Sequence, residues 1–232
     1  MDKETLVLQL RKMDLEHATD GDGGYALVRA VLTLSDSLDD ESRRCLWDVL
    51  TDLVMRRDKT LWGVALEVMI QKNQGGERLL IALSSGVEDA EWRDQIVLGL
   101  LRLAWQPATT YCAKYIGRAL SNGRRTVLPL LAALSRVNIK MCVDMASSYF
   151  AGALIQEGGS EVHRGYIPAF VRNFLEVDKS IFRDLIERTS RQNAVAGEKL
   201  RTLFDGCLSL PAYSREYGVE VIAALRGEIN DA

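Results

Sequence analysis

The chain has 232 residues, of which 47% are apolar and 26% are charged, a balance that is typical of a globular protein and excludes extensive disorder. Its net charge of −3 has the wrong sign for a protein that binds nucleic acid over its whole surface. No apolar run approaches the roughly 20 residues that a membrane-spanning helix needs, and the charged N-terminus does not resemble a secretory signal. We therefore expect a cytoplasmic protein without membrane contact.

The N-terminal third is predicted to be helical, because its apolar residues recur every three or four positions. The expected helices cover residues 5–15, 25–34, 41–56 and 61–72, followed by a short one at 77–83. Asp39 or Asp40 is a suitable N-cap for the third of these helices. A glycine-rich turn is expected at 19–24, where the two aspartates lack the later ligands of a calcium-binding loop.

The clearest helical pattern covers residues 91–137, where three amphipathic segments follow one another with very short breaks. Pro107 is expected in the first turn of the second segment, and Gly123 is suited to the left-handed residue that closes it. Pro129 lies inside the third segment. Either this helix starts later than residue 125 or it is kinked at the proline.

The C-terminal part repeats the same pattern. Helices are expected at 139–156, around Pro168, at 181–188, at 195–208 and at 217–229. Alternation of apolar and polar residues at period two is absent, so the sequence predicts eleven to thirteen helices and no sheet.

Pairs of these helices recur at intervals of thirty to thirty-seven residues. The pairs cover 41–72, 77–104, 107–137, 139–176 and 178–208. This spacing resembles that of HEAT-like α-solenoid proteins, which stack antiparallel helical hairpins side by side. The resemblance implies one all-α domain over residues 1–232, with N-terminal helices at 1–38, hairpin repeats at 41–208 and a capping helix at 213–232. An irregular multi-helix bundle is the alternative.

Few residues are suited to catalysis. Only two histidines occur, His17 and His163, and no Cys-x-x-Cys or glycine-rich phosphate-binding motif is present. We therefore expect no catalytic residues, no metal site and no cofactor. The four cysteines are widely spaced, and Cys112 and Cys142 fall on apolar faces, so buried reduced thiols are expected.

Three groups of residues are candidates for binding. The acidic connector Asp36, Asp39, Asp40 and Glu41 is a possible docking patch for a basic partner. Trp105 precedes a helix corner, where we expect it to be partly exposed and to anchor a partner. Arg124 and Arg125 form a basic pair without acidic neighbours in the sequence.

These features favour a non-catalytic protein–protein interaction module. It would be an adaptor, or a stoichiometric inhibitor such as a toxin-neutralising immunity protein, and its partner would be another protein. One alternative is a nucleic-acid-binding HEAT-like protein, which the net charge disfavours. Another is an all-α enzyme that uses the carboxylates of 36–41, with or without a metal. The sequence leaves the oligomeric state open.

Overall fold

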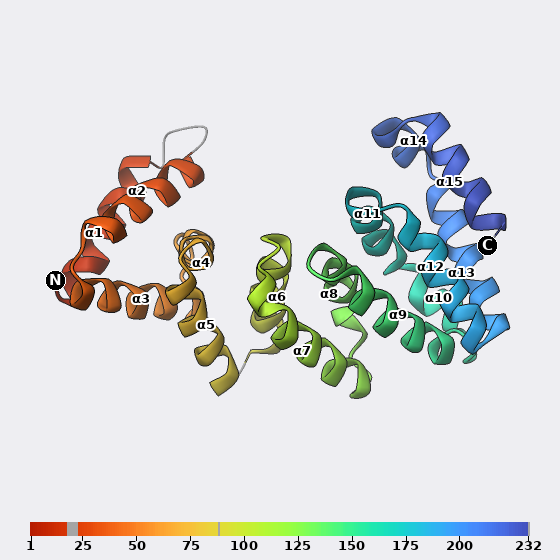
Figure 1. The fold of residues 1–232 in the computed structure, drawn as a ribbon, viewed down its shortest axis with the longest axis horizontal. Helices are drawn as coiled ribbons and strands as arrows, with labels where there is room; N and C mark the ends of the chain where they lie inside the picture. The colour runs from red at the N-terminus through yellow and green to blue at the C-terminus, as the bar shows by residue number, and fades with distance from the viewer. Residues whose placement is uncertain (18–22, 88, 232) are drawn as a thin grey trace. The chain divides into compact units, whose positions relative to one another are not determined.

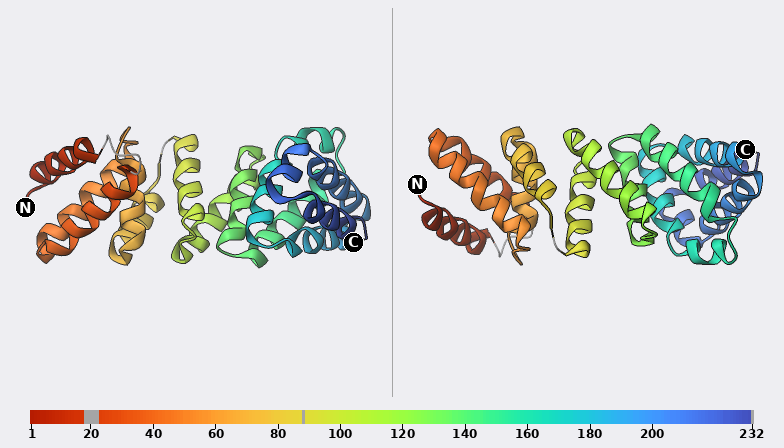
Figure 2. Two further views of the ribbon diagram at one scale, coloured as in Figure 1. Left: turned by 90° about the horizontal axis from the view of Figure 1, so that it is seen from above. Right: turned by 90° about the horizontal axis from the view of Figure 1, so that it is seen from below.

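The computed structural model describes residues 1–17, 23–87 and 89–231. Every regular element in these ranges is helical (Figure 1, Figure 2), so the expected all-α class is confirmed. The described residues form 15 α-helices and three short 3-10 helices. The chain divides into two compact units, residues 1–105 and 106–232.

Unit 1 comprises six α-helices: α1 (Lys3–His17), α2 (Gly23–Ser37), α3 (Asp40–Met55), α4 (Trp62–Gln71), α5 (Asn73–Ser85) and α6 (Ala90–Arg102). Its principal contacts join each helix to the next or to the next but one, as when α3 packs on both α4 and α5. The seam is apolar because Leu46, Leu50 and Met69 are fully buried between these helices. All four tryptophans of the chain belong to this unit.

Two helix starts in unit 1 depend on aspartate caps. The Asp39 carboxylate accepts a hydrogen bond of 2.7 Å from the backbone N–H of Ser42, which confirms one of the two expected caps of α3. Asp89 caps α6 in the same way through the backbone N–H groups of Glu91 and Trp92. These caps fix where the chain turns into α3 and α6.

Unit 2 begins with the 3-10 helix η1 (Gln106–Ala108) and α7 (Thr109–Ser121). It continues with η2 (Arg125–Val127), α8 (Leu128–Ala133), η3 (Leu134–Arg136), α9 (Ile139–Ala153), α10 (Gly159–Arg164), α11 (Ile167–Val177), α12 (Ser180–Gln192), α13 (Ala194–Leu208), α14 (Pro211–Tyr217) and α15 (Val219–Asp231). Here some packed helices are further apart in the sequence, as when α9 contacts both α12 and α13.

A row of edge-to-face aromatic rings forms the centre of unit 2. Successive ring centroids lie 5.1 to 5.7 Å apart, within the favoured range for such pairs. The row runs in order through Phe150, Phe170, Phe174, Phe182 and Phe204, all of them fully buried. These five are all the phenylalanines of the chain, and they join α9, α11, α12 and α13.

The structure decides between the two expectations for Pro129. Residues 125–127 form the 3-10 turn η2, and α8 begins at Leu128 with Pro129 in its first turn. The helix therefore starts late, at a position where the missing N–H of proline is not needed. Gly123 has a φ of +75°, so the expected left-handed residue after α7 is also confirmed.

Two short helices were not expected from the sequence. α10 follows the Gly158–Gly159 break and α14 begins at Pro211, where the sequence indicated only a break. Both helices have fewer than eight residues, too few to display an apolar period. The turn expected at 19–24 lies largely outside the described residues, although Gly23 and Gly24 already belong to α2.

The boundary between the units lies after Trp105 and does not coincide with the segments 1–38, 41–208 and 213–232. One domain over all 232 residues remains a prediction, and so does the HEAT-like stacking. Within the described ranges, none of the helices has both the length and the apolar character needed to cross a bilayer.

Candidate functional site

The carboxylates of the acidic connector are largely engaged within unit 1. Asp36 forms an ion pair of 2.6 Å with Lys72, the residue between α4 and α5, and Asp40 lies 3.1 Å from Arg43. Asp39 caps α3, and the Ser42 hydrogen bonds lower the pKa of its carboxyl group. Glu41 is exposed. The connector is thus organised around the start of α3 instead of presenting four free carboxylates to a partner.

Metal-ligating side chains do not gather at this connector. Across the described part of the chain, no group of three or more His, Cys, Asp or Glu side chains lies close enough together to hold a metal ion. The interactions that the structure shows for Asp36, Asp39 and Asp40 are a helix cap and two ion pairs.

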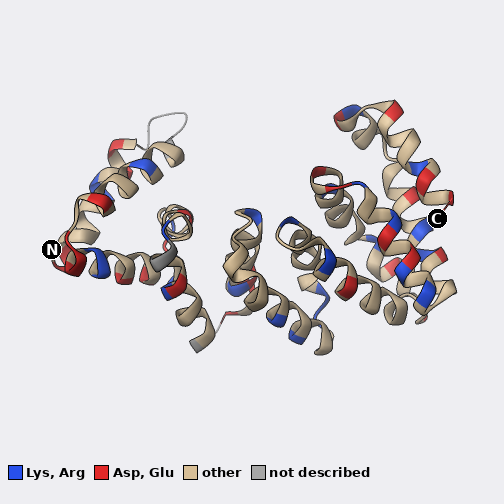
Figure 3. Cartoon of the chain, viewed as in Figure 1, with Lys and Arg blue, Asp and Glu red and all other residues tan. Residues whose placement is uncertain are grey.

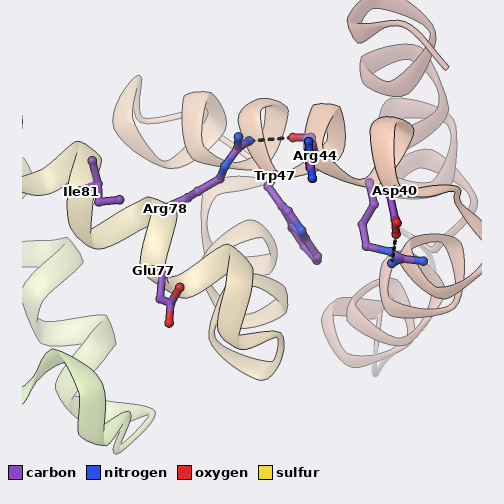
Figure 4. Close-up of a pocket in the computed structure, with 7 residues that line it drawn as sticks. Asp40, Arg44, Trp47, Glu77, Arg78 and Ile81 are labelled. Carbon is purple, nitrogen blue, oxygen red and sulfur yellow. Dashed lines mark hydrogen bonds and ion pairs between the residues drawn. The ribbon is translucent and has the colours of Figure 1, made fainter.

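A groove of about 360 Å³ opens beside this connector, between α3 and α5. Its lining residues come from both helices and are Asp40, Arg43, Arg44, Trp47, Glu77, Arg78 and Ile81. Figure 4 shows Arg44 and Trp47 projecting from α3, with Glu77, Arg78 and Ile81 on α5. The Arg78 side chain spans the two helices, because it donates a hydrogen bond of 2.9 Å to the backbone carbonyl of Arg44 and pairs with Asp48.

The groove carries charges of both signs that have no ion-pair partner in the described part of the chain. Among the described residues, neither the exposed Arg44 nor the exposed Glu77 forms an ion pair. The apolar side chain of Ile81 is 68% exposed beside them. A cation, an anion and an apolar side chain are therefore exposed together at this groove. The same combination of an apolar centre and a polar rim is found at protein–protein interfaces.

Trp47 also lines the groove, but its indole N–H is buried. Its side chain is only 2% exposed, and no described residue accepts a hydrogen bond from its indole Nε1–H. A buried N–H without an acceptor costs about 1–3 kcal/mol. Because the Nε1 atom is itself buried, a partner that docks in the groove does not reach it without moving the ring.

The partial exposure expected for Trp105 is wrong. The side chain is 7% exposed and packs on Gly76 of α5, where an added Cβ would lie 2.4 Å from the Cζ2 atom of the indole. The corner position in the sequence suggested exposure, but the glycine on another helix makes room for the ring. Trp105 is therefore part of the packing of unit 1.

Arg124 and Arg125 are adjacent in sequence but contact different elements of unit 2. The guanidinium of Arg124 lies 5.5 Å from the ring centroid of Tyr115 on α7, and its Nη2 donates a hydrogen bond of 2.9 Å to the Tyr115 hydroxyl. Arg125 lies beside the Tyr149 phenol of α9, where its charge opposes the increase in pKa that burial gives to Tyr149.

Tyr149 connects Arg125 to His163. The Tyr149 hydroxyl lies 2.8 Å from His163 Nε2, and His163 Nδ1 lies 2.6 Å from the carbonyl oxygen of Gly159. A carbonyl only accepts, so Nδ1 carries the proton and Nε2 accepts from the phenol. Burial and the nearby Arg125 lower the pKa of His163. The imidazole is 2% exposed, so it joins α9 to α10 and is not open to a substrate.

Sequence reasoning named Asp40, Arg124 and Arg125 but missed the groove residues Trp47, Glu77 and Ile81. No local pattern could identify them, because the groove exists only after α3 and α5 pack together. The sequence matches no family model, no curated protein and no solved structure.

Proposed function

We propose that this protein is a non-catalytic protein–protein interaction module and that the groove between α3 and α5 is its docking site. The observation that carries this proposal is the pair of exposed charges of Arg44 and Glu77, neither of which has an ion-pair partner among the described residues, beside the exposed Ile81. A partner segment that brings a carboxylate and a cation would pair with Arg44 and Glu77. The exposed Ile81 would be covered by the same segment.

The architecture supports this function in a second way. Near-neighbour packing of α1 to α6 is the arrangement from which HEAT-like stacks are built, and such stacks present extended binding surfaces. We propose this stacking for unit 1, together with a cytoplasmic location. An adaptor and a stoichiometric inhibitor, such as an immunity protein that neutralises a toxin, are the two forms of such a module that we favour.

The test is affinity purification of the tagged full chain from its native host. The wild type is compared with the double variant Arg44→Glu/Ile81→Glu, which reverses the free cation and places a charge on the apolar wall. Lys59→Glu is the matched control, because Lys59 is an exposed loop residue of unit 1 outside the groove. Far-UV circular dichroism verifies that all three proteins are folded.

We expect one protein to co-purify in a stoichiometric amount with the wild type and with Lys59→Glu, and to be lost from the double variant. The proposal fails if the wild type retains no protein partner. It also fails if the groove variant retains the partner as well as the control does.

A further inference from the structure

The two units differ in charge. Residues 1–105 carry thirteen Lys or Arg against nineteen Asp or Glu, a net charge of −6, whereas residues 106–232 carry sixteen against thirteen, a net charge of +3. The net charge of −3 for the whole chain is therefore the sum of an acidic unit 1 and a basic unit 2. This positive charge is concentrated where the unit begins, because residues 106–143 contain six Lys or Arg and no Asp or Glu. In Figure 3, α7 and the segment after it accordingly carry blue bands and no red ones.

Two of these cations share a face of α7, and a third is held against a tyrosine of the same helix. Lys114 and Arg118 are exposed and four residues apart, so they share a face of the helix. Tyr115 precedes Arg118 by three residues, and its ring and hydroxyl hold the guanidinium of Arg124 against α7. We name Lys114, Tyr115, Arg118 and Arg124 the α7 cationic face.

Two of the cations of this face, Lys114 and Arg118, are not neutralised within the described part of the chain. Among the described residues, neither Lys114 nor Arg118 forms an ion pair. By contrast, Arg136, which belongs to the same acid-free stretch, pairs with Glu176 and donates to Asn173. Like charges held at i and i+4 repel each other by a few tenths of a kcal/mol in an isolated helix. A bound anionic partner would relieve that repulsion.

We infer that the α7 cationic face is a second interaction surface that takes a carboxylate-rich segment of a protein. Arginine and tyrosine are enriched at protein interfaces, and Tyr115 fixes Arg124 in place, so less side-chain entropy is lost on binding. A nucleic acid fits less well. The unit has a net charge of only +3, and a duplex carries one negative charge per about 1.7 Å of its axis, which calls for a longer basic surface. This inference is independent of the groove in unit 1.

The test uses the full chain and a fluorescently labelled oligo-glutamate peptide at low salt, with a labelled single-stranded oligonucleotide of equal length as the competing probe. Lys114→Glu/Arg118→Glu reverses the two unpaired cations. The matched control Lys179→Glu changes an exposed lysine before α12 that has no ion pair among the described residues. Tyr115→Phe keeps every charge but removes the hydroxyl that holds Arg124.

We expect oligo-glutamate to bind, with at least about a tenfold loss in Lys114→Glu/Arg118→Glu and little change in Lys179→Glu. Tyr115→Phe should weaken binding about threefold, because one ion-pairing group is no longer held in place. Non-specific attraction to a basic surface would not respond to this neutral change.

Three results would overturn the inference. Equal binding by all variants would show attraction to the bulk charge alone. Tighter binding of the oligonucleotide, lost in Lys114→Glu/Arg118→Glu, would make the surface a nucleic-acid site. Self-association of the chain, measured by sedimentation and abolished by the same variant, would show that the surface pairs with a second copy.

Discussion

The indole of Trp105 packs so closely on Gly76 that no residue larger than glycine fits at position 76. A Cβ at position 76 would lie 2.4 Å from Cζ2 and 2.6 Å from Cη2 of the ring. Real Cβ atoms do not approach other atoms this closely, so the contact depends on the absence of a side chain. The segment that follows α6 and the first turn of α5 are thereby fixed together within unit 1.

Gly76→Ala should therefore destabilise unit 1. The large indole has little room to move in a packed core, and overpacking typically costs about 1–3 kcal/mol. The measurement is the free energy of unfolding in urea, followed by far-UV circular dichroism. Gly63→Ala is the control, because Gly63 is a helical glycine of the same unit with no atom within 4 Å of an added Cβ. It should be stabilising by about 0.5–1 kcal/mol. Equal effects of the two substitutions would contradict the close contact.

A second glycine contact predicts the same behaviour in unit 2. An added Cβ on Gly197 of α13 would lie 2.0 Å from Ser190 Oγ and 2.8 Å from the Ser190 Cα of α12. The hydroxyl can rotate away, but the backbone atom cannot, so Gly197→Ala should cost about 1–3 kcal/mol of stability. Gly206 lies on the same helix in open space. Gly206→Ala should leave the thermal midpoint unchanged or raised, and a lowered midpoint in both variants would refute the prediction.

The buried His163 should make unit 2 less stable in mild acid. Its folded pKa lies below the ordinary value of 6.5, so the unfolded chain takes up the proton first as the pH falls. The contribution of the neutral imidazole is complete above pH 6.5 and is lost as the pH falls from there toward the lowered folded pKa. Within that window the slope approaches about 1.4 kcal/mol per pH unit.

His163→Gln should remove this component of the pH dependence, which is measured as the difference in unfolding free energy between about pH 7.5 and pH 5.5. His17→Gln, a change of the other histidine in the chain, serves as the control and should retain the dependence. If the histidine at 163 can be replaced without altering the slope, its folded pKa is not lowered.

The four thiols should differ in reactivity. Burial raises the pKa of Cys112 and of Cys142 to about 12, and Cys207 is also buried with a raised pKa. The thiolate is the reactive form, so these three should react slowly with Ellman's reagent in the folded protein. Cys45 is the one cysteine of intermediate exposure, whereas the other three are buried. Cys45→Ser should abolish the fast phase, and urea should expose the remaining thiols. A fast phase that survives in Cys45→Ser would contradict the burial.

The helices themselves followed from the sequence because apolar residues at a period of 3.6 are a strong local pattern. The Asp39 cap and the Gly123 closure are likewise local and were confirmed. The short helices α10 and α14 were not predicted from the sequence, because six or seven residues are too few to display a helical period. Local patterns therefore predict the long elements and their ends.

The candidate site could be predicted only in part. Arg124 was identified from the sequence as one of a pair of adjacent arginines. Its hydrogen bond to Tyr115, however, depends on the turn that the chain makes at Gly123. Trp105 was misplaced because the space it occupies is created by Gly76, about thirty residues earlier. Contacts between helices decide both cases, and no single-helix pattern encodes them.

Tryptophan and phenylalanine lie in different units of the chain, so tryptophan is a built-in optical label for unit 1. All four tryptophans lie within residues 1–105, and all five phenylalanines lie within residues 106–232. Intrinsic tryptophan emission therefore reports on the first unit alone. If the two units melt at different temperatures, comparing this emission with the helical signal of the whole chain will reveal which one melts first, without any added dye or mutation.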